Sequence, residues 1–289
     1  MASPPSPITV RIDKGVRLAG ALLAAGDWPD YEQTVKPYKS HRVAEHAHKH
    51  FASYAGHPAV IAARMMVGDG SGLTTLFTHA LNADWPADVT TLLADFQSVA
   101  KPDEFWAETQ ADWAQAESDG REIAARADLR QFLTDVFGSL AREITLVPNL
   151  LFPGLLSITL QTATEVALIQ PPPKAWGTSP PWRYNERPDE VEAALAEAYA
   201  RHLFETSLPA DQTALKPHAG VFALAAAVLF LRQAEGEAAG DQFMMMEKRT
   251  RHLPKLPAVV MALEPLLADR RAGKYAGFAD YLPQLAGHF

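Results

Sequence analysis

The sequence contains no cysteine. The chain therefore has no disulfide, no thiolate-bound zinc or iron–sulfur cluster, and no thiol nucleophile. A chain of 289 residues buries about three quarters of the surface that its unfolded form exposes, so it needs no cross-link for stability. Any metal site in this protein has to be built from histidine and carboxylate side chains.

Basic residues are also in deficit. The chain has 26 Lys and Arg against 34 Asp and Glu, which gives a formal net charge of −8. Proteins that bind nucleic acids depend on Lys and Arg to neutralise phosphates, so we predict no nucleic-acid partner. Hydrophobic residues make up 48% of the chain and charged residues 21%, which is typical of a globular protein.

Long hydrophobic runs are missing as well. The longest, Ala219 to Leu231, spans 13 residues, fewer than the roughly 20 that cross a bilayer. We interpret it as a buried core helix and predict no membrane span. Lys14 and Arg17 precede a short Ala-rich run, as in a signal peptide, but the alternating segment 8–13 favours a strand followed by a helix. A cytoplasmic location is the prediction, and an exported protein is the alternative.

Helical spacing of apolar residues dominates the rest of the chain. The exceptions are residues 143–147, 157–160 and 166–169, which are rich in β-branched residues. The first two flank Pro153-Gly154 and are predicted to pair as a hairpin. The sequence thus predicts a mainly α (α+β) fold, with many helices and a small β-hairpin or sheet insert near the middle.

A loop rich in proline divides the predicted helices. Pro171–Pro188 holds six prolines and two tryptophans, Trp176 and Trp182. We place an N-terminal helical part with short strands at 1–170, the loop at 171–188 and a C-terminal helical part at 189–289. Tryptophan is common at recognition surfaces, so this loop is a candidate contact for a peptide or protein partner.

Histidines gather in one segment. His46 and His50 are four residues apart and share a helical face, a spacing at which imidazoles bind zinc. A third ligand is missing, so a solvated helix face is the main interpretation, with a metal site or a substrate-binding or pH-sensing role as alternatives. His57 precedes Pro58 at a helix start and is a candidate cap or binding residue. The cluster runs from His41 to His57 and also includes His48.

The helix predicted from Asp189 to Glu205 carries a glutamate in its middle. Glu197 lies among alanines, with Tyr199 and His202 beside the apolar stripe. An isolated glutamate on a helix is most often solvated. The small neighbours leave space around the carboxylate, which suits either a site or close packing against another helix.

The order of features resembles the DUF4932 family, bacterial proteins with a gluzincin-like (zinc metallopeptidase) helical domain. The resemblance covers most of the chain in short pieces. These are Ile8–Ile12, Arg17–Gly20, Tyr38, Phe51, Tyr54, His57-Pro58, Phe105-Trp106, Asp128-Leu129, Phe137-Gly138, Pro148, Gly154, Met246-Glu247 and Tyr275–Pro283.

The resemblance implies a degenerate active site. Active members would carry His-Glu-x-x-His, in which two histidines bind zinc and the glutamate acts as general base. Glu197 matches that glutamate, but Ala196 and Ala200 occupy the histidine positions, and alanine cannot coordinate a metal. The expected downstream glutamate is absent, although His218 lies in its region. Two routes to a metal remain: an altered site built from Glu197, His202 and His218, or the histidine cluster near residue 50 folding over the missing ligand position.

Three functions follow as hypotheses. The first is a zincin-like protein that has lost its zinc and acts as a binding or structural module, with no cofactor. The second is an active hydrolase, a peptidase, with an atypical His/Glu metal site that holds zinc. The third is a helical protein-binding module unrelated to peptidases, in which Trp176 and Trp182 contact the partner.

Overall fold

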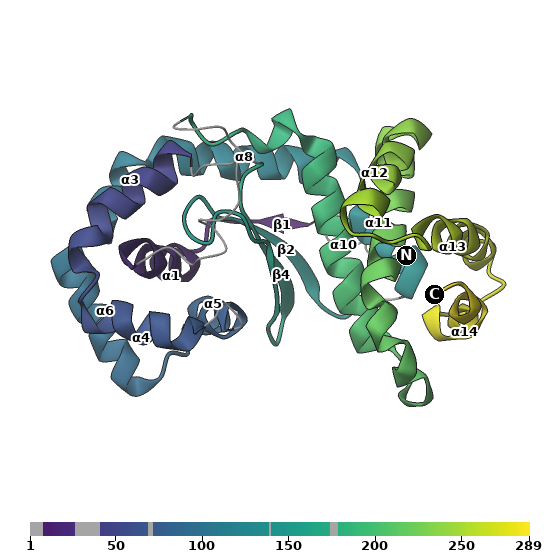
Figure 1. The fold of residues 1–289 in the computed structure, drawn as a ribbon, viewed down its shortest axis with the longest axis horizontal. Coiled ribbons are helices and arrows are strands. Elements are labelled where there is room, and N and C mark those ends of the chain that lie inside the picture. Colours follow the sequence, from purple (N-terminus) through teal and green to yellow (C-terminus); the bar gives the residue numbers. More distant parts are fainter. Residues whose placement is uncertain (1–7, 27–40, 69–71, 139, 174–178) are drawn as a thin grey trace, which may run out of the picture. The chain divides into compact units, whose positions relative to one another are not determined.

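The computed structural model describes residues 8–26, 41–68, 72–138, 140–173 and 179–289. These residues are mainly α-helical with one small sheet, which confirms the predicted mainly α (α+β) class (Figure 1). Two compact units share the chain. The N-terminal unit comprises Thr9–Glu122 and Thr145–Arg187, and the C-terminal unit consists mainly of Ile123–Ile144 and Pro188–Phe289.

The unit boundaries follow the sequence only in part. Pro188 begins the long helix α10 of the C-terminal unit, whereas the sequence prediction includes Pro188 in the loop and begins the helix at Asp189. The segment Ile123–Ile144, which the sequence grouped with the N-terminal part, belongs to the C-terminal unit. Its helix α9 (Leu129–Phe137) buries an apolar face that includes Phe132 and Val136 within that unit.

The N-terminal unit is built around helix α1 (Lys14–Ala25). Asp13 begins this helix by accepting a hydrogen bond from the Val16 amide at 3.0 Å, an N-cap. Its apolar residues 18–25 are buried, and the surrounding helices curve around it in Figure 1. The helices of this unit are α3 (Arg42–Phe51), α4 (Pro58–Val67), α5 (Leu73–Asn82), α6 (Ala87–Ala100), α7 (Pro102–Glu108) and α8 (Gln110–Arg126) as far as Glu122, with the short 3-10 helices η1 (Ala52–Tyr54) and η2 (Tyr184–Glu186).

The sheet has the order β1-β2-β4-β3. Its strands are β1 (Thr9–Val10), β2 (Glu143–Pro148), β3 (Ile158–Gln161) and β4 (Glu165–Gln170). β1 runs parallel to β2, with Thr9 opposite Thr145, and β3 runs antiparallel to β4, with Ile158 opposite Ile169.

The hairpin predicted around Pro153-Gly154 is wrong, because β3 pairs with β4 and not with β2. The connection from β3 to β4 is only three residues long, and the Thr162 hydroxyl accepts hydrogen bonds from the Thr164 and Glu165 amides within it. Such a short turn makes neighbouring strands pair readily. The stretch Leu150–Phe152 is buried in the core instead of forming a turn.

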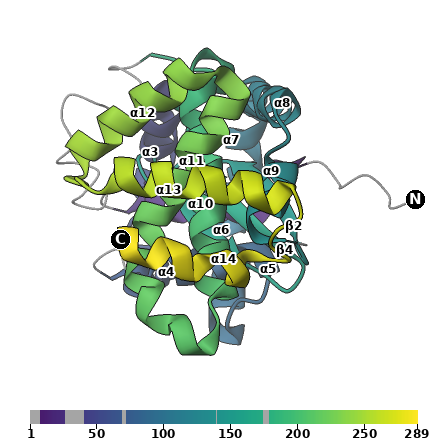
Figure 2. The same cartoon turned by 90° about the vertical axis from the view of Figure 1, so that its right-hand side faces the viewer.

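The C-terminal unit is a helical bundle. Helices α10 (Pro188–Ser207) and α11 (Ala219–Glu235) pack side by side, and the later helices run across them (Figure 2). Phe204, Phe222 and Phe278 meet in an aromatic core. The other elements are η3 (Ala210–His218), α12 (Glu237–Thr250), α13 (Leu256–Arg271), α14 (Phe278–Leu285) and η4 (Ala286–His288).

The longest apolar helix of the chain lies in this unit. The 3-10 helix η3 continues into α11, so that Ala210–Glu235 forms 26 helical residues around the predicted 13-residue run. By length and composition alone it would reach across a membrane, and it is the one such helix among the described residues. In the structure 61% of its most apolar stretch is buried, which is also the pattern of a core helix in a globular unit.

Helix α5 ends on a residue with a left-handed backbone. Ala83 has φ 52 at the C-cap, and this conformation costs an L-residue about 1 kcal/mol that glycine avoids. We expect Ala83→Gly to raise the free energy of unfolding by about 0.5 kcal/mol in urea titrations. The control Ala80→Gly, inside the same helix, should lower it by about 1 kcal/mol. A destabilised Ala83→Gly protein would contradict the left-handed cap.

Candidate functional site

Glu197 lies on α10 and is held by two arginines. The Arg251 guanidinium donates to both carboxylate oxygens, at 2.6 and 2.9 Å, and Arg201 donates from one helical turn away at 3.3 Å. The side chain of Glu197 is only 16% exposed. A bidentate charge-assisted pair of this kind is strong and fixes the geometry of both groups. Glu197 is therefore a counter-ion in this structure, with both oxygens engaged.

Arg251 joins Glu197 to a second carboxylate. Its Nε lies 2.5 Å from the buried Glu247, one turn back on α12. Burial lowers the pKa of Arg251, but the hydrogen bonds and charges of Glu197 and Glu247 outweigh burial, and its pKa is raised. The arginine thus stays positively charged.

A pocket of about 530 Å³ adjoins this ion-pair network. Three cationic side chains line it, those of Arg201, Arg251 and Lys255, and we call it the cationic pocket. The remaining wall is largely apolar. Its apolar residues are Pro217, Val221, Leu224, Leu253, Pro254 and Phe289. Positive groups beside an apolar wall are the features of a small-molecule site for an anion.

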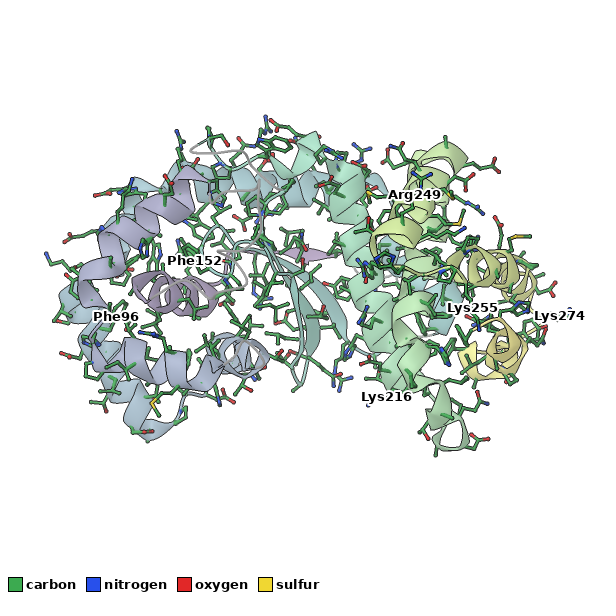
Figure 3. The ribbon with its side chains drawn as sticks, in the orientation of Figure 1. Phe96, Phe152, Lys216, Arg249, Lys255 and Lys274 are labelled. Atoms are coloured by element: carbon green, nitrogen blue, oxygen red, sulfur yellow. The ribbon has the colours of Figure 1, made fainter. Side chains whose placement is uncertain are left out.

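Two segments border the cationic pocket. One is the junction of η3 and α11, near Lys216, and the other is the turn before α13, which ends at Lys255 (Figure 3). The His218 ring stacks on the Phe289 ring with centroids 4.9 Å apart and planes 7° apart. Lys255 donates a hydrogen bond to a main-chain oxygen of Phe289. In the same turn His252 has φ 54, a left-handed conformation that is uncommon outside glycine.

The alanines at the two expected histidine positions are buried. Ala196 and Ala200 are 0% exposed, so any larger side chain there would have to enter the core of the C-terminal unit. Tyr199 is also buried, at 1% exposure. His202 is half-buried, and burial, followed by the charge of Arg142, lowers its pKa. Of the residues singled out by the resemblance, Glu197 and His218 reach the cationic pocket or its ion pairs, whereas Tyr199 and His202 do not line it.

His57 lies in the N-terminal unit and caps a helix. Its Nδ1 accepts a hydrogen bond from the Ala59 amide at 3.1 Å, its Nε2 lies 3.1 Å from Asp95, and its ring packs against Phe96. Both ring nitrogens therefore have partners inside the protein. The structure gives His57 the local role of an N-cap, one of the two roles considered from the sequence.

His46 and His50 share a helical face on α3 that protein covers only in part, since the His46 side chain is 49% exposed and His50 is half-buried. Both rings contact Phe105, and His46 also lies 3.8 Å from Glu108. His48 is bound elsewhere, through Nδ1, to the Ala24 carbonyl at 2.7 Å. Across the ranges that the structure describes, no group of three His, Asp or Glu side chains has the arrangement of a metal site. In the proline-rich loop, Trp182 is half-buried and Trp176 lies outside the described residues.

The sequence did not lead us to predict the three cations of the pocket, Arg201, Arg251 and Lys255. A signal for them was present, because Lys248, Arg249, Arg251 and Lys255 place four cations within eight residues of a chain with net charge −8. Arg201 is not part of such a cluster of basic residues in the sequence. It gains its place because α10 packs on α11, where Gly220 leaves room for its guanidinium: a Cβ there would lie 3.2 Å from Arg201 Nη2.

A second unusual carboxyl lies on α10. Glu192 is 2% exposed, and burial followed by repulsion from Glu235 raises its pKa to about 7. The Arg126 Nε lies 3.4 Å from Glu192 Oε1, and Arg126 also forms an ion pair with Glu235. Neither oxygen of Glu192 has a hydrogen bond of normal geometry, so its charged form is poorly compensated.

No family model, curated protein or solved structure matches this chain. The resemblance to the DUF4932 family therefore stays a prediction, which rests on the order of short sequence features.

Proposed function

We propose that this protein is a binding module for a small anionic ligand, without a catalytic zinc, and that the cationic pocket is its binding site. The observation that carries the proposal is the pocket of about 530 Å³ with three cationic side chains and an apolar wall. Pockets of this volume bury most of a small ligand, and a few polar groups then fix its orientation.

The geometry around Glu197 favours binding over hydrolysis. A general base needs a carboxylate oxygen that is free to take a proton from water. Both oxygens of Glu197 accept hydrogen bonds from Arg251, so the carboxylate is committed to positioning that arginine. We assign Glu197 the role of a positioning residue for the cations of the pocket.

Thermal unfolding in the presence of anions tests the proposal. The probes are acetate, benzoate, decanoate and inorganic phosphate at constant ionic strength. We expect at least one to stabilise the protein by about 2.7 kcal/mol at a concentration 100 times its Kd. The double variant Arg201→Met/Lys255→Met should lose that stabilisation, since both removed cations line the pocket.

The matched control is Lys274→Met, which removes an exposed lysine that pairs with Asp269 and does not line the pocket. It should keep the response of the unmodified protein. A protein that responds to none of the four anions, or a response that survives in the double variant, would contradict the proposal.

A further inference from the structure

The three cations that line the cationic pocket, taken with their glutamate partners, indicate how many negative charges a ligand should bring. Arg201, Arg251 and Lys255 contribute three positive charges, and the paired carboxylates of Glu197 and Glu247 offset two of them. One positive side-chain charge is left. A monoanion balances it, whereas a dianion such as a phosphate monoester would leave an excess negative charge close to Glu197.

The three cations differ in how many donors they have left. Arg251 donates from Nη1 and Nη2 to Glu197, and its Nε forms an ion pair with Glu247. Arg201 uses one nitrogen on Glu197, at the long distance of 3.3 Å, and Lys255 donates one hydrogen bond to a main-chain oxygen of Phe289. Since guanidinium has five N–H donors and ammonium three, Arg201 and Lys255 keep donors for a ligand, while Arg251 mainly holds the two glutamates.

The wall of the pocket needs an apolar partner. Val221 and Leu224 come from the first turns of α11, and Leu253 and Pro254 from the turn before α13. Leu224 is 1% exposed, so the part of the wall that faces water consists of Val221, Leu253 and Pro254. An inorganic anion would leave these three side chains uncovered. An aliphatic chain that covers them gains about 0.8 kcal/mol for each CH₂ group that becomes fully buried.

We infer that the ligand of the cationic pocket is an amphipathic monocarboxylate, whose carboxylate binds Arg201 and Lys255 and whose aliphatic chain lies against Val221, Leu253 and Pro254. The inference rests on the proposed function and narrows it to one chemical class. It also gives Glu197 a second effect, because its negative charge disfavours ligands that carry two charges.

Isothermal titration of the full chain with hexanoate, octanoate, decanoate, decanol, decyl phosphate and inorganic phosphate tests the inference. Affinity should rise about two- to fourfold with each added CH₂ from hexanoate to decanoate, since partial burial yields part of the full increment. Decanoate should bind at least about tenfold more tightly than decanol, which lacks the charge-assisted contacts. At a pH where it carries two charges, decyl phosphate should bind more weakly than decanoate.

Three variants locate the contacts. Lys255→Met should weaken decanoate by about tenfold or more, and Lys274→Met should leave its affinity unchanged. Glu197→Gln removes one negative charge, so it should improve decyl phosphate relative to decanoate. Circular dichroism checks that each variant is folded. If folded Glu197→Gln protein has an unchanged ratio of decyl phosphate affinity to decanoate affinity, Glu197 has no role in specificity.

The outcomes separate this inference from the proposed function. Equal affinity along the carboxylate series, or equal affinity for decanol and decanoate, would overturn the amphipathic monocarboxylate. If inorganic phosphate or decyl phosphate then binds and depends on Lys255, the anion-binding module stands with a different ligand. If no anion binds at all, both the module and its ligand class are wrong.

Discussion

The double variant Ala196→His/Ala200→His is expected to lose about 4 kcal/mol or more of unfolding free energy and to gain no zinc site. It restores the His-Glu-x-x-His pattern around Glu197, but both alanines are 0% exposed. Each imidazole would overfill a packed core and would bury ring nitrogens without partners. Urea denaturation and metal analysis of the purified protein measure the two effects.

A matched control keeps the helix and the spacing but moves the histidines. Ala194 and Ala198 are also four residues apart on α10, and both are half-buried. Ala194→His/Ala198→His should therefore cost clearly less than the first pair. A stable Ala196→His/Ala200→His protein that binds one zinc ion would show that these positions open onto a cleft, and it would favour the zincin interpretation. Stoichiometric zinc in the unmodified protein would contradict the zinc-free binding module directly.

The variant Glu192→Gln is expected to be more stable than the unmodified protein at pH 8 and to have a flatter dependence of stability on pH. The folded state raises the pKa of Glu192 from 4.5 to about 7, through burial and then Glu235. The folded protein therefore binds the proton more tightly than the unfolded chain does. Stability should fall as pH rises from about 4.5 to 7, and the loss is complete above 7.

Glutamine has no proton to lose, so this part of the pH dependence should disappear in the variant. We expect a gain of roughly 1 to 3 kcal/mol at pH 8 and little difference at pH 4, since one pKa unit corresponds to 1.4 kcal/mol. Urea titrations at pH 4, 6 and 8 measure both values. The groups facing Glu192 are Glu235, Arg126 and Asp189, and the variant leaves all three in place. A Glu192→Gln protein that is less stable at pH 8 would mean that the ion pair with Arg126 outweighs burial.

The helices of this protein could be predicted from the sequence because helix formation depends on residues close together in the chain. The helix predicted from Asp189 to Glu205 spans Pro188–Ser207, one residue more at its start and two more at its end. Helix periodicity and caps involve residues three or four positions apart. The sheet was predicted less accurately than the helices. Its three longer strands were predicted, but β2 and β3 were expected to pair with each other, and they do not. Strand pairing depends on which segments meet, and the hydrophobic pattern of each strand does not specify its partner.

The candidate site also combines local features that the sequence predicts with contacts between distant segments that it does not. Glu197 was singled out, but its partner Arg251 lies 54 residues further along the chain. No spacing rule joins those positions, because they meet only where α12 returns to α10 through the packing of the C-terminal bundle. The cations near residue 250 were visible as a local cluster, whereas Arg201 looked like one charged residue among many on its helix.

By itself, the sequence determined the helical class, the sheet segments near the middle and the exclusion of every chemistry that needs cysteine. These properties follow from composition and from patterns within a few residues. Tertiary structure decided that Ala196 and Ala200 are core positions, that Glu197 is a counter-ion and that three cations share one apolar pocket. Each of these depends on burial and on contacts between distant segments, which exist only after the helices have packed.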